Sequence, residues 1–360
     1  MVARGVPDLE ASLAPKRRTS MRDVARVAGV SLSSVSLVAA ERPGVGEETR
    51  ARVLEAMQRL GYDLPRRPSR DRERYTLAII SEQLLQPIER DIFYAEILQG
   101  IQMEAQQQGH RVLLHLLQSG DSESPLLDIG VQDEVSGMIL ANGGDLTDDL
   151  IVRLAQSRVP IVLVDNYVIN QPLHCVVADN VTAGYQATQH LLRLGHRRVA
   201  LLPGPRKYRS LADRQEGYLD ALAEYGVAID QDLMPQPTHH AGGQKGYHQM
   251  LRLLQLPQPP TAVVAISDKT AFGAMEALKE HGKQIPADVA LVSIDDVAES
   301  AHTTPALTTV QVPRAEMGGE AVRRLLALLG GFAPRPTKTV LYTKLVVRES
   351  CGAAGTTGQR

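Results

Sequence analysis

The sequence has few of the residues that usually build chemical centres. It contains no tryptophan and only two cysteines, Cys175 and Cys351, among 360 residues. Two cysteines cannot form a disulfide framework or a four-cysteine zinc site, and the ten histidines show no metal-ligand spacing with them. We therefore expect no metal and a reducing compartment. Long hydrophobic runs are also absent, since stretches such as 159–164 fall far short of the ~18 residues of a transmembrane helix, and this excludes a membrane protein.

The first twenty residues lack an apolar segment of signal-peptide length and carry Asp8 and Glu10, so we expect a cytoplasmic protein. The length predicts two or three folded units. Charge is unevenly distributed between them. Residues 1–76 hold 15 Lys and Arg against 10 Asp and Glu, a balance of +5, whereas the remainder holds 24 against 31, a balance of −7. Such a basic head is either a solvated surface or a nucleic-acid-binding surface.

Three short helices are predicted in the basic head. Ser20 is placed to cap the first helix, and Gly29 can adopt the left-handed conformation that ends it. Ser31 is placed to cap the second, and a third helix is expected over about 47–60. Two helices joined by a tight glycine turn form a helix-turn-helix, whose second helix is of a size to enter the major groove of DNA.

The head contains a recognisable string. Residues 21–31 read Met-Arg-Asp-Val-Ala-Arg-Val-Ala-Gly-Val-Ser, and Val35-Ser36, Thr49-Arg50 and Leu60-Gly61-Tyr62 follow. This string resembles the head of the lactose/galactose repressor (LacI/GalR) family, and the resemblance implies binding of double-stranded operator DNA. The DNA-binding residues that we expect are Arg22, Ser31, Leu32, Ser33, Ser34, Ser36, Leu37 and Arg50.

The second helix departs from the family pattern, which usually reads Ser-x-x-Thr-Val-Ser-Arg-Val-Leu-Asn. Ser34 stands for the threonine, Leu37 for the guanine-reading arginine, and Gly46 for the serine that caps the third helix. Base contact would then fall to Leu32, Ser33 and Leu37, two of which offer only apolar contact. Phosphate contact would come from Arg22, Arg26, Arg50 and the basic cluster 16–18, unless these are ordinary solvated charges.

Residues 63–76 form an interdomain linker by composition. In the family this segment carries a short helix that wedges a leucine into the minor groove, and no leucine stands at a matching place after Leu64. Pro68 disfavours helix before it. Five arginines favour an extended basic arm that tracks phosphates. A short helix over 69–73 is the alternative.

The acidic remainder alternates between strand-like and helical segments. The apolar runs are 77–80, 112–117, 138–141, 161–164, 199–202, 262–266 and 289–294. Runs of this kind separated by helical crossovers predict an α/β fold with parallel sheets. About 280 residues of this pattern exceed one compact core, so we expect two lobes.

The resemblance extends over these residues. The segments 93–101, 162–165, 194–204, 214–218, 267–268 and 305–309 look like the family's effector-binding core, which has the fold of the type I periplasmic sugar-binding proteins. It implies two lobes that exchange strands near residues 179 and 307, a cleft between them, and a homodimer. The expected organisation is an extension (1–19), a helix-turn-helix domain (20–62), a linker (63–76), a core (77–348) and a tail (349–360). Lobe 1 would hold about 77–178 and 308–338, and lobe 2 about 179–307 and 339–348.

Polar side chains follow three of the predicted strands. Asp165, the pair Ser267-Asp268 and the pair Asp295-Asp296 stand where strands end, at the edge where open α/β sheets bind ligands. Carboxylates that cap the next helix are the alternative, which we favour for Asp268 and leave open for Asp296. The resemblance implies five effector contacts, none of them catalytic: Tyr94, Asp165, Arg214, Ser267 and Asp295.

An enzyme is the competing class. The sequence has no GxSxG elbow, no P-loop and no Gly-x-Gly-x-x-Gly after a first strand, so we expect no catalytic residues and no cofactor. The adjacent His239 and His240 could partly replace an aromatic that the family stacks on its ligand, or be exposed loop residues. The sequence thus predicts a cytoplasmic, homodimeric transcription regulator, a repressor, with a sugar-like effector. A small-molecule-binding protein or enzyme with a basic head remains the alternative.

Overall fold

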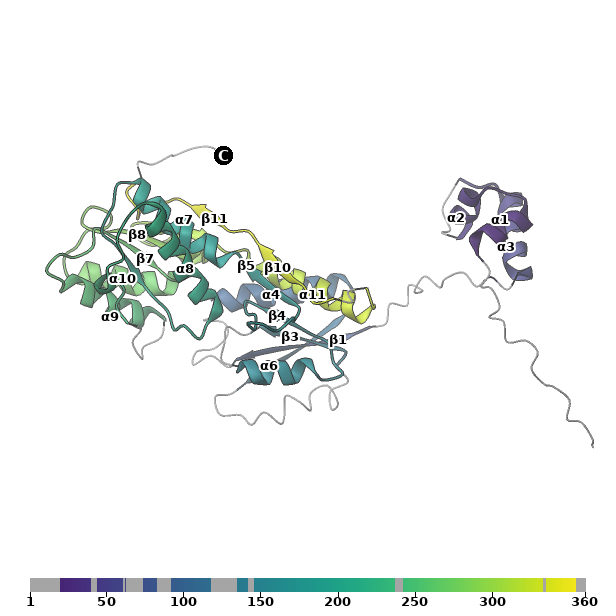
Figure 1. Ribbon diagram of the computed structural model, residues 1–360, viewed down its shortest axis with the longest axis horizontal. Helices are drawn as coiled ribbons and strands as arrows, with labels where there is room; N and C mark the ends of the chain where they lie inside the picture. The colour runs from purple at the N-terminus through teal and green to yellow at the C-terminus, as the bar shows by residue number, and fades with distance from the viewer. Residues whose placement is uncertain are drawn as a thin grey trace, which may run out of the picture. The chain divides into compact units, whose positions relative to one another are not determined.

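The computed structural model describes residues 20–39, 44–60, 62, 74–82, 92–117, 135–141, 146–236, 242–332 and 335–353. The chain divides into two compact units, which we call the head (up to Glu73) and the core (from Arg74). Figure 1 labels their helices and strands. The extension, linker residues 63–73 with four of the five linker arginines, and His239 and His240 lie outside the described residues.

The head consists of α1 (Met21–Ala28), α2 (Leu32–Ala39) and α3 (Glu47–Arg59). The start of α1 is fixed by a capping box, in which the Asp23 amide donates to Ser20 Oγ and the Ser20 amide donates to the Asp23 carboxylate. Gly29 ends α1 in the left-handed conformation, at φ 64°. Ser31 Oγ accepts a hydrogen bond from the Ser34 amide at 3.1 Å, so the predicted caps of both helices are confirmed.

Apolar side chains from all three helices close a small core in the head. Val24, Val35 and Val53 are fully buried, one from each helix. Their spacing explains why three helices this short hold together, since none is long enough to be stable alone. Gly46 precedes α3 without a side-chain cap, and the acidic residues of the first turn, Glu47 and Glu48, face the positive end of the helix dipole instead.

The first lobe of the core is a six-stranded parallel sheet in the order β10-β5-β4-β3-β1-β2. Its strands are β1 (Thr76–Glu82), β2 (Arg111–Leu117), β3 (Gly137–Ala141), β4 (Ile161–Val164), β5 (Cys175–Ala178) and β10 (Lys338–Leu341). Alternate side chains of the sheet point to opposite faces. One face packs against α4 (Ile92–Gln107) and α11 (Arg314–Leu329), the other against α6 (Asp148–Ala155).

The second lobe is a five-stranded sheet in the order β11-β9-β8-β7-β6. Its strands are β6 (Val199–Leu202), β7 (Ala262–Ala265), β8 (Ala290–Asp295), β9 (Thr308–Gln311) and β11 (Lys344–Val346), of which only β11 runs antiparallel to its neighbour. One face packs against α7 (Asn180–Arg193) and α8 (Arg209–Glu224), the other against α9 (Gly242–Leu254) and α10 (Asp268–Glu280). Two short 3-10 helices, η2 (Gln231–Leu233) and η3 (Ala298–Ala301), complete it.

Helices α7 and α8 approach each other through glycine. A Cβ atom at Gly184 would lie 1.9 Å from the carbonyl oxygen of Arg214, and one at Gly217 would lie 1.9 Å from that of Val181. No side chain fits at either position. Arg214 is therefore held at a fixed distance from α7, with its side chain inside the protein.

The predicted two-lobed α/β fold is confirmed, and all seven predicted strands are present. The lobe boundaries differ from the expectation in two places. β9 pairs with β8, so residues 308–311 belong to the second lobe and the chain returns to the first lobe after Gln311. β10 pairs with β5 along its whole length, so the last crossing follows Leu341 rather than residue 338. β9 pairs with the strand that precedes it in the chain, whereas β10 pairs with β5, which lies far earlier in the sequence.

Candidate functional site

Two buried carboxylates follow strands of different lobes. Asp165 comes directly after β4 of the first lobe, and Asp295 is the last residue of β8 in the second. Both have positive φ angles, 58° and 137°, which turn the chain sharply where the strand stops. Aspartate is enriched in the left-handed region relative to most residues. Only 4% of Asp165 and 5% of Asp295 is exposed, so neither is an ordinary surface acid.

Arg214, from α8, joins this site with a buried guanidinium. Its Nη1 lies 2.9 Å from Asp295 Oδ1, its Nε donates to Asn180 Oδ1 at 2.9 Å, and Nη1 also donates to the Ile266 carbonyl at 2.8 Å. These contacts reach three elements of the second lobe. The planar fork is thus held in one orientation by the protein itself.

Asp165 has unused hydrogen-bonding capacity. The Tyr94 hydroxyl donates to Asp165 Oδ2 at 3.2 Å, while Oδ1 is buried without a hydrogen-bond partner among the described residues. Burial raises the pKa of this carboxyl to about 7, an effect that the charge of Arg214 opposes and that the hydroxyls of Tyr94 and Ser210 also oppose. A buried oxygen without a donor is costly, and a ligand hydroxyl would satisfy it.

The negative charge of Asp295 is compensated more fully than that of Asp165. Burial raises its pKa to about 6, and the charge of Arg214 is the largest opposing influence. Its backbone carbonyl accepts from Arg314, which also donates to the Asp296 carbonyl at 2.9 Å. The same guanidinium binds both carboxylate oxygens of Glu96 on α4, at 3.0 and 2.9 Å. Arg314 therefore ties the first lobe to the strand end that carries Asp295.

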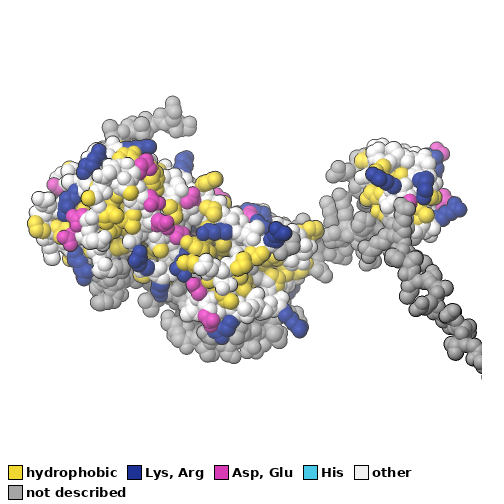
Figure 2. All heavy atoms as spheres, viewed as in Figure 1, with side chains coloured by type: hydrophobic (Ala, Val, Ile, Leu, Met, Phe, Trp, Pro, Cys, Tyr) yellow, Lys and Arg dark blue, Asp and Glu magenta, His cyan; other side chains and the backbone are white. Residues whose placement is uncertain are grey.

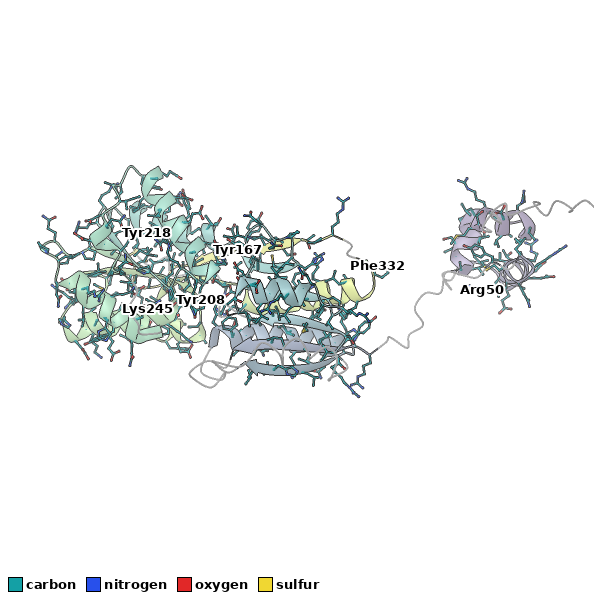
Figure 3. The ribbon with its side chains drawn as sticks, turned by 60° about the horizontal axis from the view of Figure 1, so that its bottom comes forward. Arg50, Tyr167, Tyr208, Tyr218, Lys245 and Phe332 are labelled. Atoms are coloured by element: carbon teal, nitrogen blue, oxygen red, sulfur yellow. The ribbon has the colours of Figure 1, made fainter. Side chains whose placement is uncertain are left out.

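The structure adds a basic residue that the sequence analysis missed. Lys245, on α9, is 5% exposed, and burial lowers the pKa of its ammonium to about 8 although the charge of Asp295 opposes this. The labelled side chains of Lys245, Tyr208 and Tyr167 follow one another from the second lobe toward the first in the view of Figure 3. The one available signal was a lysine on the buried stripe of α9, which also carries Gln249 and Met250.

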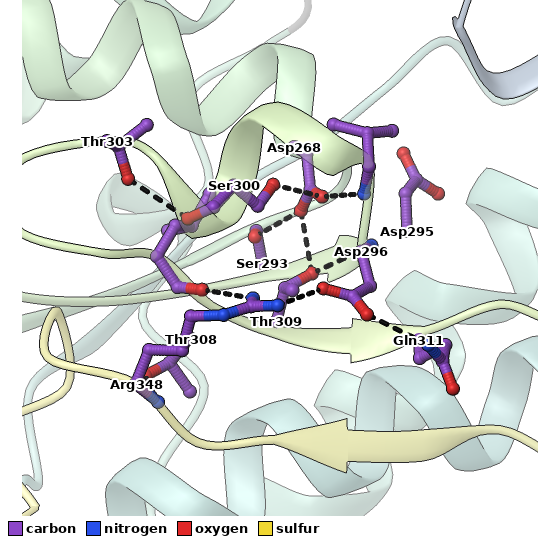
Figure 4. Close-up of polar contacts among 12 residues, drawn as sticks. Asp268, Ser293, Asp295, Asp296, Ser300, Thr303, Thr308, Thr309, Gln311 and Arg348 are labelled. Carbon is purple, nitrogen blue, oxygen red and sulfur yellow. Dashed lines mark hydrogen bonds and ion pairs between the residues drawn. The ribbon is translucent and has the colours of Figure 1, made fainter.

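The other polar residues at these strand ends have partners of their own. Asp268 accepts hydrogen bonds from Ser293, Ser300, Thr309 and the Val297 amide, as Figure 4 shows. It therefore braces β8, β9 and η3, and the helix cap expected of it is supplied by its neighbour. That neighbour is Ser267, whose hydroxyl accepts from the Thr270 amide at 3.3 Å.

Asp296, for which two interpretations stayed open, is likewise engaged. Its Oδ1 pairs with Arg348 Nη2 at 2.7 Å, and its Oδ2 accepts from Gln311 Nε2 at 2.9 Å. These contacts hold strand β9 and the last residues of the core against the end of β8 (Figure 4). The structure thus brings Tyr94, Asp165, Arg214 and Asp295 together and leaves Asp296 in a bracing position.

On the head, α2 presents a surface without charge. Leu32, Ser33 and Ser36 are exposed, Ser34 and Leu37 are half-buried, and no residue of α2 is acidic or basic. The Ser31 hydroxyl contacts those of Ser33 and Ser34 at 2.7 and 2.9 Å. Arg22 is exposed and Arg50 half-buried, and Figure 2 shows basic side chains on the surface of the head. The helix offers hydroxyl and apolar groups, while its neighbours offer charge.

Two findings concern what the described residues lack. No described helix is both long and apolar enough to span a membrane. Nowhere in the described parts do three or more His, Cys, Asp or Glu side chains gather as metal ligands would.

Comparison with known proteins covers both units. Residues 20–64 match the bacterial regulatory proteins, lacI family, and residues 188–351 match a periplasmic binding protein-like domain. The chain is 31% identical over 348 residues to the HTH-type transcriptional repressor CytR of Escherichia coli, covering 94% of this chain and 99% of that protein. It is 33% identical to the HTH-type transcriptional regulator MalR of Streptomyces coelicolor, covering 93% and 97%.

Solved structures agree with these relatives. A complex of the transcriptional regulator CelR with cellobiose has a TM-score of 0.71 at 30% identity, over 92% of this chain and 100% of that one. A lac repressor dimer bound to operator and the anti-inducer ONPF has a TM-score of 0.67 at 26% identity, over 94% and 100%. The chain belongs to the lacI family of bacterial regulatory proteins, whose members are transcriptional regulators and not enzymes.

Proposed function

We propose that this protein is a homodimeric repressor that binds an inverted-repeat operator and is controlled by a small polar effector, a sugar or sugar derivative. The observation that carries the proposal is the buried site formed by Asp165, Arg214 and Asp295. Two strand ends, one from each lobe, supply its carboxylates, and Asp165 Oδ1 lacks a hydrogen-bond partner among the described residues. A ligand that satisfies this oxygen contacts both lobes and therefore favours one arrangement of them.

The chemistry of the site supports a polyol. A sugar hydroxyl both donates and accepts hydrogen bonds. The two carboxylates can accept from such hydroxyls and the guanidinium can donate to them. Tyr94 and Tyr208 add aromatic surface nearby, each half-buried. The cellobiose complex of CelR supports the same class of ligand by similarity.

An exposed apolar surface on the first lobe supports the dimer. Met103 on α4 and Leu114 and Leu116 on β2 are 52%, 47% and 43% exposed. β2 is the edge strand of its sheet, and apolar side chains also gather over the region of α4 and α11 in Figure 2. Clusters of this kind mark protein interfaces. The lac repressor structure, which is a dimer on operator, supports the same assembly.

The exposed residues of α2 support DNA recognition by hydroxyl and apolar side chains. α2 would enter the major groove with Ser33 offering hydrogen bonds and Leu32 and Leu37 offering apolar contact to thymine methyl groups. Arg22 and Arg50 would hold the phosphates. Specificity would then rest on hydroxyl and methyl contacts instead of an arginine fork on guanine.

Selection of bound fragments from the source genome, repeated with a panel of sugars, tests this function. We expect one inverted repeat to be recovered and one sugar to change its recovery. Affinity for the repeat should fall steeply as salt rises, because phosphate contacts release counterions. Recovery of no common sequence would contradict the proposed function.

The head variants sharpen the same experiment. Replacing Ser33 or Leu37 by Ala should change base preference at particular half-site positions, whereas Arg22→Ala should weaken binding to all sequences about equally. Uniform weakening by Leu37→Ala, with unchanged preference, would remove α2 from direct base contact.

A further inference from the structure

Helix α9 begins at the same sheet edge as the effector site. It starts at Gly242 and ends at Leu254, before β7 runs from Ala262 to Ala265. β7 is parallel to β6 and β8, so their carboxyl ends share one edge, where Asp295 ends β8. A helix that leads back to the start of such a strand has its N-terminus at that edge. The first turn of α9 therefore lies beside the site.

Lys245 in that first stretch of α9 is buried without a partner. The residue is only 5% exposed, and its side chain forms neither a hydrogen bond nor an ion pair with any residue that the structure describes. The charge of Asp295 raises the pKa of Lys245 and that of Arg214 lowers it, and both are site residues. Buried lysines without a partner are rare, because an ammonium loses its hydration on burial.

The acidic side chains of the site form their ion pairs with residues other than Lys245. Asp295 is ion-paired with Arg214 at 2.9 Å, and Glu96 is ion-paired with Arg314 at 2.9 Å. Asp165 carries a pKa near 7 because burial disfavours its charged form, so it compensates a second cation poorly. Once these ion pairs are counted, Lys245 is a site cation that has no ion pair of its own among the described residues.

The N-terminus of α9 adds positive electrostatic potential to that of the Lys245 ammonium. This helix has 13 residues and no acidic residue in its first turn, in contrast to α6, which begins with Asp148 and Asp149. The first amides of a helix have no partner within it, and the helix dipole places partial positive charge there. Gly242 and Gly243 carry no side chain that would cover those amides.

From these observations we infer that the effector is an acidic sugar, whose carboxylate or phosphate group pairs with Lys245 at the start of α9 while its hydroxyls bind Asp165 and Arg214. This inference rests on the proposed function and narrows its ligand class. An anion would satisfy the unpartnered ammonium and raise its lowered pKa, as a nearby negative charge does. A neutral sugar would leave that ammonium without a counter-charge.

Calorimetry on the full-length protein tests the inference with matched probes. The probes are D-glucose, D-glucuronate and D-glucose 6-phosphate, together with the corresponding galactose and ribose compounds, so that carboxylate and phosphate are separated. We expect one acidic member to bind at least about tenfold more tightly than its neutral parent. Lys245→Met, which keeps the length of the side chain, should remove that preference.

Two variants control the experiment. Lys245→Arg keeps the charge and should retain most of the preference for the acidic sugar. Lys279→Met removes an exposed lysine near the C-terminus of α10. It should leave the affinities for both kinds of sugar unchanged. Thermal unfolding of each variant, followed by circular dichroism, shows whether it is folded.

The outcomes separate the two claims. Equal affinity for acidic and neutral sugars, unaffected by Lys245→Met, would overturn the inference and leave the proposed function standing. Equal losses for both kinds of sugar in Lys245→Met would overturn it too, because the lysine would then act on the fold of the site. Binding of no sugar, charged or neutral, would contradict the proposed function and with it this inference.

Discussion

The core buries two kinds of aspartate at its strand ends. Asp268 is completely buried and accepts four hydrogen bonds, from three hydroxyls and one amide. Asp165 is almost as deeply buried, yet one of its oxygens has no partner among the described residues. Both residues follow an apolar strand, Asp165 directly and Asp268 after Ser267. Their partners differ, and a satisfied carboxylate holds the fold while an unsatisfied one is available to a ligand.

The partners of Asp268 explain why the distinction is invisible in the sequence. Ser293, Ser300 and Thr309 lie 25, 32 and 41 residues away, on β8, η3 and β9. They reach the carboxylate only because β8 and β9 pair beside α10. The serines and threonines of this segment carried no pattern that marked them as donors.

The largest expected effect comes from removing the satisfied carboxylate. Asp268→Ala leaves three hydroxyls and the Val297 amide without their acceptor inside the core, which should lower the free energy of unfolding by about 3–4 kcal/mol. Urea unfolding followed by circular dichroism measures it, since the chain has no tryptophan to report by fluorescence. A loss as small as that of a surface substitution would mean that Asp268 does not brace this lobe.

Replacing the unsatisfied carboxylate of Asp165 should stabilise the protein instead of destabilising it. The pKa of Asp165 is raised to about 7 from the ordinary 3.8, so its ionisation weakens the folded state increasingly as pH rises between these values. Asp165→Asn removes that cost and keeps an acceptor for Tyr94. The variant should be more stable than the wild type at pH 8 by about 2 kcal/mol, with the difference vanishing near pH 4.

Unfolding measured across this pH range provides the check. The same gain at every pH would show that the substitution acts through packing and not through the charge. Asp296→Asn is a suitable contrast, because Asp296 is already paired with Arg348 and its loss should destabilise the protein.

The smallest effect concerns the Tyr94 hydroxyl, which donates to Asp165 Oδ2. Tyr94→Phe removes the 3.2 Å hydrogen bond to Oδ2, which stabilises the charged form of the carboxyl. The pKa of Asp165 should therefore rise further, and stability above pH 7 should fall by roughly 0.5–1 kcal/mol. A titration of the carboxyl by nuclear magnetic resonance records the shift, and an unchanged midpoint would show that Tyr94 does not bond the carboxylate.

The sequence predicted the elements that have strong local patterns. The caps of α1 and α2 are set by Ser20, Gly29 and Ser31, whose neighbours in the chain are their partners. The longer apolar runs became strands. β9, β10 and β11 were not predicted, because each has only three or four residues and carries Thr or Lys among them. β5 (Cys175–Ala178) was not predicted although its residues are apolar.

The candidate site divides in the same manner. Asp165 and Asp295 could be found because they follow strong strands, and Arg214 and Tyr94 came from a family resemblance. Lys245, Asn180 and the pair Glu96–Arg314 could not be found, since their importance depends on contacts between elements. Arg314 and Glu96 are 218 residues apart in the chain.

The central claim is that the unsatisfied Asp165 is a ligand-binding group, and binding of the sugar panel to the Asp165→Asn variant tests it most directly. This variant is expected to be folded and more stable than the wild type at neutral pH, so lost binding cannot be attributed to unfolding. Calorimetry should show that the sugar bound by the wild type binds about tenfold or more weakly to Asp165→Asn. Equal affinity in the two proteins would contradict the account.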